Sequence, residues 1–269
     1  MMKFNAIIIV LVIVLVIALW IAFASAFASS AGAKKEVALI ASERYFPDAI
    51  GLQWTYSGSV AKQIQRVSSD DYTNTAIVKG KTNKLGVPAV IFWESNQSNQ
   101  GQAESYFSRD SKGISYLGGR PTTDFETQLV PFMAIPFPIV LGKTYLQVEK
   151  NNLQYDLDLD GDGQREKASA RSEVTAVGLE TVSTPAGIFN DTIKFQGVMT
   201  VWITLSRDAK RVPIVGKTAH WYAKDIGLVK QIEKLDFSEE IEGSPLGTIT
   251  TEVLTEYIKP KSLNEGIFK

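Results

Sequence analysis

The sequence predicts a single, mostly β domain whose strands pair mainly antiparallel. Side chains alternate between apolar and polar from Ile193 to Leu205, which is the period of a half-buried strand. Short runs rich in β-branched and aromatic residues recur along the chain, separated by clusters of Gly, Asn, Ser and Asp. Beyond the apolar N-terminus, no stretch carries the long 3.6-residue apolar stripe of an amphipathic helix.

The N-terminus predicts export. Lys3 precedes an apolar run from Ala6 to Ala24, close to the ~20 residues that span a bilayer. Two small-residue cleavage patterns follow, at Ala24–Ala26 and Ala26–Ala28, so the segment suits a removed signal peptide as well as a membrane anchor. We therefore expect residues 1–28 to be a signal peptide or anchor helix and residues 29–269 to form an extracytoplasmic β domain, membrane-anchored or secreted.

Composition excludes several chemistries. The formal net charge is −1 and the basic residues are dispersed, so the basic footprint of a nucleic-acid binder is missing. There is no cysteine, which excludes disulfides, thiolate ligands, a cysteine nucleophile and a lipid-modified cysteine. A single histidine makes a zinc site improbable and leaves carboxylates and carbonyls as ligands.

Local patterns place most of the strands. Turn residues mark a hairpin at Arg109–Gly113, a turn at Thr184–Phe189 and a tight hairpin at Asp225–Gly227, and a shift of apolar parity marks a bulge at Gly178. A short helix near Tyr45 is compatible with the pattern. Strands are expected at Gly51–Tyr56, Thr73–Lys79, Pro88–Glu94, Gln102–Ser108, Gly113–Leu117, Val174–Val182, Ile193–Leu205, Thr218–Lys224, Leu228–Leu235 and Thr248–Ile258.

The stretch Val130–Leu141 is strongly apolar but contains Pro131, Pro136 and Pro138. Proline at this density forbids a regular helix or a central strand, so the segment must pack irregularly. We expect it to be a connection that crosses an open end of the sheet and plugs the core. The alternative is that it forms the wall or lid of an apolar pocket.

An acidic stretch, Asp156–Gly163, carries the most specific chemical signal. The alternation from Leu153 to Asp160 predicts a strand with an apolar and an acidic face, turned by two glycines. The pattern D-x-D-x-D-G is typical of calcium loops, but Ser169 stands where an EF-hand has its bidentate Glu. Two alternatives remain: a weak Ca²⁺ site, on the order of 10⁻⁴ to 10⁻³ M, or an acidic turn. The expected ligands are Asp158, Asp160, Asp162, Gln164 and Glu166.

Three segments together resemble an uncharacterised family of exported prokaryotic β-rich proteins: Trp54–Tyr56 after Gly51, Val182–Phe189 and Trp221–Val229. The resemblance implies a strongly curved antiparallel sheet or half-barrel, similar in outline to lipoprotein carriers. It brings no established activity and no catalytic residues. The chain departs from the carriers in lacking a lipid-modified cysteine and in carrying the acidic stretch.

Three classes of function remain. A Ser-His-Asp mechanism would have to use His220, and no G-x-S-x-G elbow is present. On its alternating strand we expect His220 to lie at the surface or rim. We therefore favour a non-catalytic binding or cell-envelope module, with an apolar ligand or an envelope component as partner. The alternatives are a calcium-dependent surface adhesion domain and a hydrolase with two carboxylates across a cleft.

Overall fold

The computed structural model describes residues 36–62, 70–95, 101–237 and 247–260, and in these ranges the chain is almost entirely β. The first half contains β1 (Val37–Ala38), the 3-10 helix η1 (Ser42–Tyr45), β2 (Gln53–Lys62), β3 (Asp70–Lys84), β4 (Val87–Glu94), β5 (Ala103–Asp110), β6 (Gly113–Arg120), the helix α2 (Asp124–Leu129) and β7 (Phe132–Pro136). The second half contains β8 (Val140–Leu141), β9 (Thr144–Gln154), β10 (Lys167–Thr184), β11 (Gly187–Thr204), β12 (Arg211–Ala223), β13 (Gly227–Phe237) and β14 (Gly247–Ile258).

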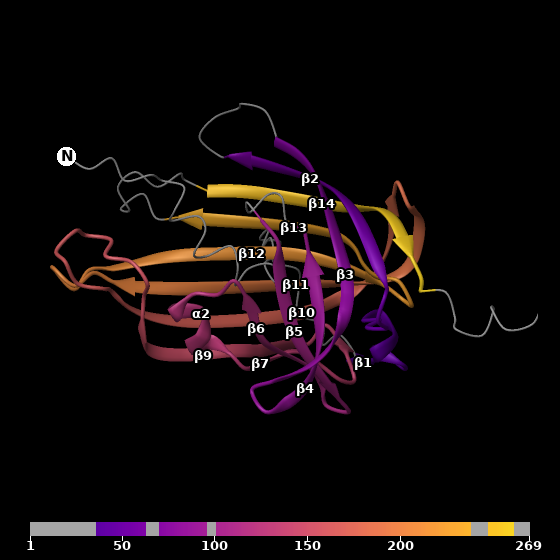
Figure 1. Cartoon of the computed structure of the whole chain (residues 1–269), viewed down its shortest axis with the longest axis horizontal. Coiled ribbons are helices and arrows are strands. Elements are labelled where there is room, and N and C mark those ends of the chain that lie inside the picture. Colours follow the sequence, from indigo (N-terminus) through magenta and orange to yellow (C-terminus); the bar gives the residue numbers. More distant parts are fainter. Residues whose placement is uncertain (1–35, 63–69, 96–100, 238–246, 261–269) are drawn as a thin grey trace, which may run out of the picture.

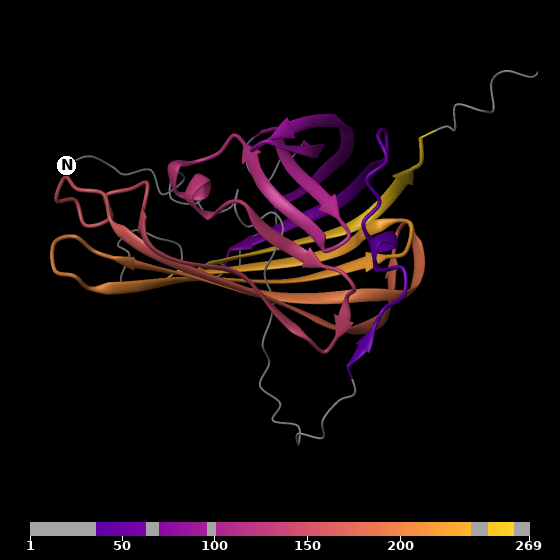
Figure 2. The same ribbon diagram turned by 90° about the horizontal axis from the view of Figure 1, so that it is seen from below.

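Twelve strands form one antiparallel sheet in the order β7-β6-β5-β4-β3-β2-β14-β13-β12-β11-β10-β9, while β1 pairs with β8 in a small separate sheet. The sheet curls so that the strands of the first half fold back over the long orange and yellow strands β11–β14 (Figures 1 and 2). Its two edges meet at Gln147 on β9, which donates Nε2 to the Ala134 carbonyl of β7 at 2.8 Å. The predicted curved sheet is therefore present as a nearly closed barrel.

The prediction that the odd-numbered residues of the strand from Ile193 face the core is confirmed. On β11, the odd positions Ile193, Phe195, Met199, Val201 and Ile203 are at most 8% exposed. The outward positions Val198 and Trp202 are 39% exposed. The predicted bulge on β10 is also present, because the register with β11 shifts between Ala176 and Gly178. The two-residue period of the sequence predicted this strand correctly because one face stays toward the core and the other toward solvent along the strand.

The predicted continuation of a strand through Asp160 is wrong. Strand β9 ends at Gln154, and residues 155–166 form a loop of bends and turns. Aspartate side chains in this loop accept backbone N–H groups, which removes those groups from any strand ladder. Leu157 and Leu159 nevertheless pack against the core, so the apolar half of the alternation was a correct sign of burial.

The prediction that the proline-rich segment packs irregularly is wrong for β7 and β8, which pair as strands with β6 and β1. Pro131 and Pro136 bound β7, which lies at the edge of the sheet where a missing N–H is tolerated. Ile139 is fully buried and contributes to the core, as expected for a plug. Ala134 and Ile135 also line an interior cavity, so the pocket-wall alternative holds for that part of the segment.

The N-terminal segment 1–28 lies outside the described residues. None of the helices within the described ranges is long and apolar enough to cross a membrane. The short helix that the pattern allowed near Tyr45 is η1. Helix α2 was not predicted, although Thr123 and Glu126 form a capping box whose T-x-x-E spacing is visible in the sequence.

Candidate functional site

The acidic loop between β9 and β10 is organised by carboxylates that accept backbone N–H groups. Asp158 accepts from Gly161 at 2.6 Å and from Gly163 at 2.8 Å, which closes the turn. These bonds, the one from Gly163 first, lower the pKa of Asp158. Both glycines have positive φ, 70° and 89°, a conformation that other residues rarely adopt.

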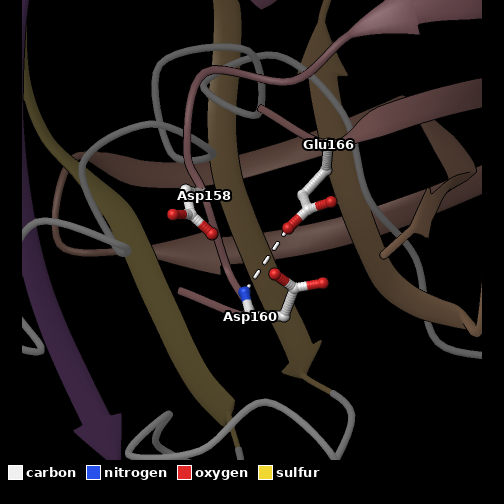
Figure 3. Close-up of side chains that lie close together, drawn as sticks. All are labelled: Asp158, Asp160 and Glu166. Carbon is white, nitrogen blue, oxygen red and sulfur yellow. Dashed lines mark hydrogen bonds between the residues drawn. The ribbon is translucent and has the colours of Figure 1, made fainter. Parts of the chain in front are cut away.

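Glu166 anchors this loop to a second one. Its side chain is fully buried, and Oε1 accepts the Leu159 N–H at 3.0 Å while Oε2 accepts the Ser206 N–H at 2.7 Å. A third donor, the Asp160 N–H, reaches Oε1 at 3.4 Å (Figure 3). One buried carboxylate therefore joins residues 159–160 to the turn that follows β11.

Three of the five predicted calcium ligands converge. Oxygen atoms of Asp158, Asp160 and Glu166 all lie within 4.8 Å of one another, and Figure 3 shows the three carboxylates facing a common space. Asp162 instead accepts the Ser206 hydroxyl at 2.9 Å. Gln164 donates its backbone N–H to Asp162 Oδ1. Calcium–oxygen distances of about 2.3–2.6 Å allow ligand atoms about 5 Å apart, so the convergent trio has a compatible spacing.

A second candidate site lies inside the curled sheet. A cavity of about 140 Å³ lies between strands of the first and second halves. Its walls are mostly aromatic and aliphatic. The main aromatic residues are Phe46, Trp54, Tyr56, Phe92, Phe107 and Tyr222, and the polar residues on strands of the sheet are Asn74, Glu94, Ser108, Arg109, Gln231 and Glu252.

Two of these polar residues, Gln231 and Glu252, belong to a row of paired residues that crosses six strands. The cross-strand pairs are Phe195↔His220, His220↔Gln231, Gln231↔Glu252, Glu252↔Gly58 and Gly58↔Tyr72. Residues paired directly across an antiparallel sheet point to the same face. The row therefore places a histidine, an amide, a carboxyl group and a phenol side by side on the concave face.

Glu252 is the centre of this row. It is 4% exposed, and it accepts the Tyr72 hydroxyl at 2.8 Å, Asn74 Nδ2 at 3.2 Å and Gln231 Nε2 at 2.7 Å. Burial nevertheless raises its pKa to about 7. Burial, followed by the nearby Glu252 charge, raises the pKa of Glu94 to about 8. This side of the cavity is therefore rich in hydrogen-bond acceptors, and burial disfavours the ionised form of its carboxyl groups.

The expectation that His220 lies at the surface or rim is wrong. Its side chain is 1% exposed, and burial lowers its pKa to about 3. Nε2 lies 3.9 Å from Glu233 Oε1, and burial raises the pKa of Glu233 to about 8. The parity argument correctly grouped His220 with Tyr222, but it assigned that face to solvent when it points into the barrel.

Gly58 makes room for Tyr72 in the row. A Cβ atom at Gly58 would lie 2.2 Å from Tyr72 Cζ, so Gly58→Ala must displace the ring and its bond to Glu252. We expect a loss of about 1–3 kcal/mol in the free energy of unfolding, measured by urea denaturation. Gly80→Ala on β3 is the control, because a Cβ there meets nothing within 4 Å. Equal effects of the two substitutions would contradict this packing.

One side of the cavity is bounded by the segment 46–48, which is held by Arg109. Arg109 Nε lies 3.1 Å from Asp48, and Nη2 donates to the Phe46 carbonyl. The side chains of Arg109 and Asp48 are 27% and 34% exposed, so the cavity reaches solvent beside this ion pair. Arg44, next to this segment, pairs with Asp225 in the turn before β13.

Residues 133–245 match the DUF3108-like family. The matched residues begin in β7 and continue through β13, so they include the acidic loop, His220 and Glu233. Two of the three segments that carried the predicted resemblance, Val182–Phe189 and Trp221–Val229, lie inside it, whereas Trp54–Tyr56 lies outside. No curated protein matches the chain.

Two solved structures are similar to this chain. One is a putative exported protein with YmcC-like fold from Bacteroides fragilis, with 18% identity, and the other a putative lipoprotein from Parabacteroides distasonis, with 16% identity. Each comparison covers 80% of this chain and 98% of the other, with a TM-score of 0.36.

Proposed function

We propose that this chain is a non-catalytic extracytoplasmic binding module that holds a small apolar group in the interior cavity. The cavity itself carries the proposal: it has a volume of about 140 Å³, aromatic walls and a few convergent polar groups. This is the usual composition of a small-molecule site. An apolar cavity of about 150 Å³ is large enough to hold benzene, so a single ring or a short alkyl chain fits.

The position of the histidine does not support catalysis by a histidine base. His220 is 1% exposed and does not belong to the described residues that line the cavity. A histidine that acts as a general base must come within hydrogen-bond reach of the reacting proton. The extracytoplasmic location in this proposal rests on the apolar run from Ala6 to Ala24.

The proposal is tested with a neutral aromatic probe, 2-phenylethanol, by ligand-observed NMR and thermal unfolding. We expect saturable binding to the wild-type protein with a rise in melting temperature. Ala76→Leu and Ala134→Leu both add volume at buried positions on the cavity wall and should abolish binding. Two variants are used because overpacking alone costs about 1–3 kcal/mol, and a variant counts only if it unfolds cooperatively.

Val198→Leu provides the control, since it adds volume on the outward face of β11, where the side chain is 39% exposed. It should bind 2-phenylethanol as the wild type does. If neither a neutral probe nor a charged aromatic probe binds the wild-type protein, the cavity is only a packing defect and the proposed function is wrong.

We propose second that the acidic loop binds Ca²⁺ weakly and thereby stabilises the barrel. The convergence of Asp158, Asp160 and Glu166 within 4.8 Å supports this role. Glu166 also bonds the turn after β11, so an ion bound there would be coupled to two loops. The donors are all hard oxygens, which suit Ca²⁺ better than the stricter octahedral geometry of Mg²⁺.

Calcium at a hundredfold its dissociation constant should add about 2.7 kcal/mol to the free energy of unfolding. The measurement is thermal unfolding in calcium, magnesium or a chelator at matched ionic strength. Asp160→Asn should reduce the gain, whereas Asp208→Asn, in the exposed turn after β11, should leave it unchanged. An equal shift with magnesium and calcium would mean that the loop is only an acidic turn.

A further inference from the structure

The charge balance around the cavity is acidic. Among the described residues that line it, Glu94, Glu252 and Asp48 are acidic and Arg109 is the one cation. Arg109 lies 3.1 Å from Asp48, so these two charges compensate each other at the solvent-facing side. Glu94 and Glu252 remain on the inner side without a cationic partner among the lining residues.

The inner carboxyl groups offer acceptors to the cavity from two separate strands, β4 and β14. Glu252 already accepts three side-chain hydrogen bonds, all from neutral donors. Glu233, beside them on the concave face, has a buried Oε1 that accepts no hydrogen bond within the described structure. A neutral donor neutralises no charge, so a buried carboxylate here would still gain from a cation.

The aromatic walls favour the same kind of group. Trp54 donates Nε1 to the Ile226 carbonyl at 2.6 Å, and Tyr56 donates its hydroxyl to the Leu228 carbonyl at 3.1 Å. The polar ends of both rings are thus satisfied by backbone, while both side chains line the cavity. Electron-rich aromatic rings attract cations within about 6 Å, and ammonium ligands are commonly held by several such rings.

We propose that the ligand of this cavity is an amphiphile with a cationic ammonium head, which lies between Glu94 and Glu252, and a short apolar body, which lies against the aromatic walls. This inference rests on the proposed binding function and specifies the chemical class of the ligand. A carboxylate ligand is disfavoured, because its charge would face two acidic side chains.

Binding of such a cation should be linked to proton release. Burial raises the pKa of Glu94 to about 8 and of Glu252 to about 7, so the ligand-free cavity holds protons at neutral pH. A bound ammonium favours the ionised carboxylates and displaces those protons. Of the other titratable groups on this face, Glu233 titrates in the same direction, and His220, with a pKa of about 3, stays neutral throughout. Burial raises the pKa of Tyr56 and of Tyr222, so both phenols stay neutral, and Arg109 and Asp48 pair with each other.

The test compares three single-ring probes by calorimetry: 2-phenylethylammonium, 2-phenylethanol and 3-phenylpropionate. We expect the cation to bind at least about tenfold more tightly than the alcohol at pH 8.5, as for a charge-assisted contact, and the anion to bind least. The cation's affinity should rise at least about fivefold from pH 6.0 to 8.5, with protons released to the buffer. An alkylammonium with a pKa near that of lysine, about 10.4, stays charged over this range.

Glu94→Gln should remove most of the preference for the cation, because it lowers the affinity for 2-phenylethylammonium far more than the affinity for 2-phenylethanol. Glu256→Gln, on an exposed position of β14, is the charge-matched control and should change neither. If the alcohol binds as tightly as the cation, the ammonium assignment is wrong although the binding function stands. If no probe binds, both are wrong.

Discussion

Replacing Glu166 with alanine is expected to lower the free energy of unfolding by about 3–5 kcal/mol. The carboxylate is fully buried and accepts backbone N–H groups from Leu159, Asp160 and Ser206. Removing it leaves these donors without a partner, and each buried N–H group without an acceptor lowers the free energy of unfolding by about 1–3 kcal/mol. The measurement is the urea midpoint and slope of the purified chain.

Two further variants separate the causes. Glu173→Ala removes a glutamate from the outer face of β10, where its side chain is 41% exposed and pairs with Arg171, so the loss should stay below about 1 kcal/mol. Glu166→Gln keeps the shape but turns an NH₂ group toward N–H donors, and should fall between the two alanine variants. If Glu166→Ala costs no more than Glu173→Ala, the carboxylate does not anchor the loops.

The same variant discriminates between the two roles of the acidic loop. A purely structural Glu166 should be equally costly to remove in a chelator and in calcium. If Glu166 acts chiefly as a metal ligand, the cost should appear in calcium and largely vanish in the chelator. With the proposed calcium site, both contributions should appear: a large cost in the chelator, from the N–H groups of Leu159 and Ser206 that lose their acceptor, and a larger cost in calcium.

Most of the strands could be predicted from sequence because their signals are local. The period of β11, the bulge at Gly178 and the hairpin at Asp225–Gly227 depend on neighbours within a few residues. The strand prediction failed for the loop after β9. There the aspartate side chains accept backbone N–H groups two to five residues away, and these hydrogen bonds replace strand pairing. An alternating pattern alone cannot show whether the backbone pairs as a strand or bonds to its own aspartate side chains in a loop.

The interior cavity was beyond local reasoning. Tyr72 and Glu252 are 180 residues apart and meet only because the sheet places β3, β2 and β14 side by side. The sequence did carry a weak signal. The odd-numbered positions of β13 are apolar and buried at Val229 and Leu235, but Gln231 and Glu233 between them are polar. Polar residues at core parity indicate a buried network, but the sequence does not identify their partners.

The chain is expected to lose stability as the pH rises from 5.5 to 8.0. Burial raises the pKa of Glu94 and Glu233 to about 8 and of Glu252 to about 7, whereas ordinary glutamates titrate near 4.5. In this interval the unfolded chain has already released these protons and the folded chain still holds them. Stability falls with pH wherever the folded state binds more protons, and His220, with its pKa lowered to about 3, opposes this only below about pH 6.5.

One extra proton held over this interval corresponds to about 3.4 kcal/mol, at about 1.4 kcal/mol per pH unit. The three carboxyl groups lie close enough to repel one another, so they share this effect and their separate shifts do not add. We expect a loss of about 2–4 kcal/mol between pH 5.5 and 8.0, measured as urea stability at fixed ionic strength.

Glu233→Gln tests the origin of this loss, because glutamine keeps the size of the side chain and cannot ionise. The variant should flatten the pH profile and be more stable relative to wild type at pH 8.0 than at pH 5.5. Glu256→Gln, on the exposed side of β14, should reproduce the wild-type slope. A wild-type stability that is constant or rising over this interval would show that the interior carboxyl groups are ionised in the folded chain. The concave face would then already be charged, and a cationic ligand would bind without releasing protons.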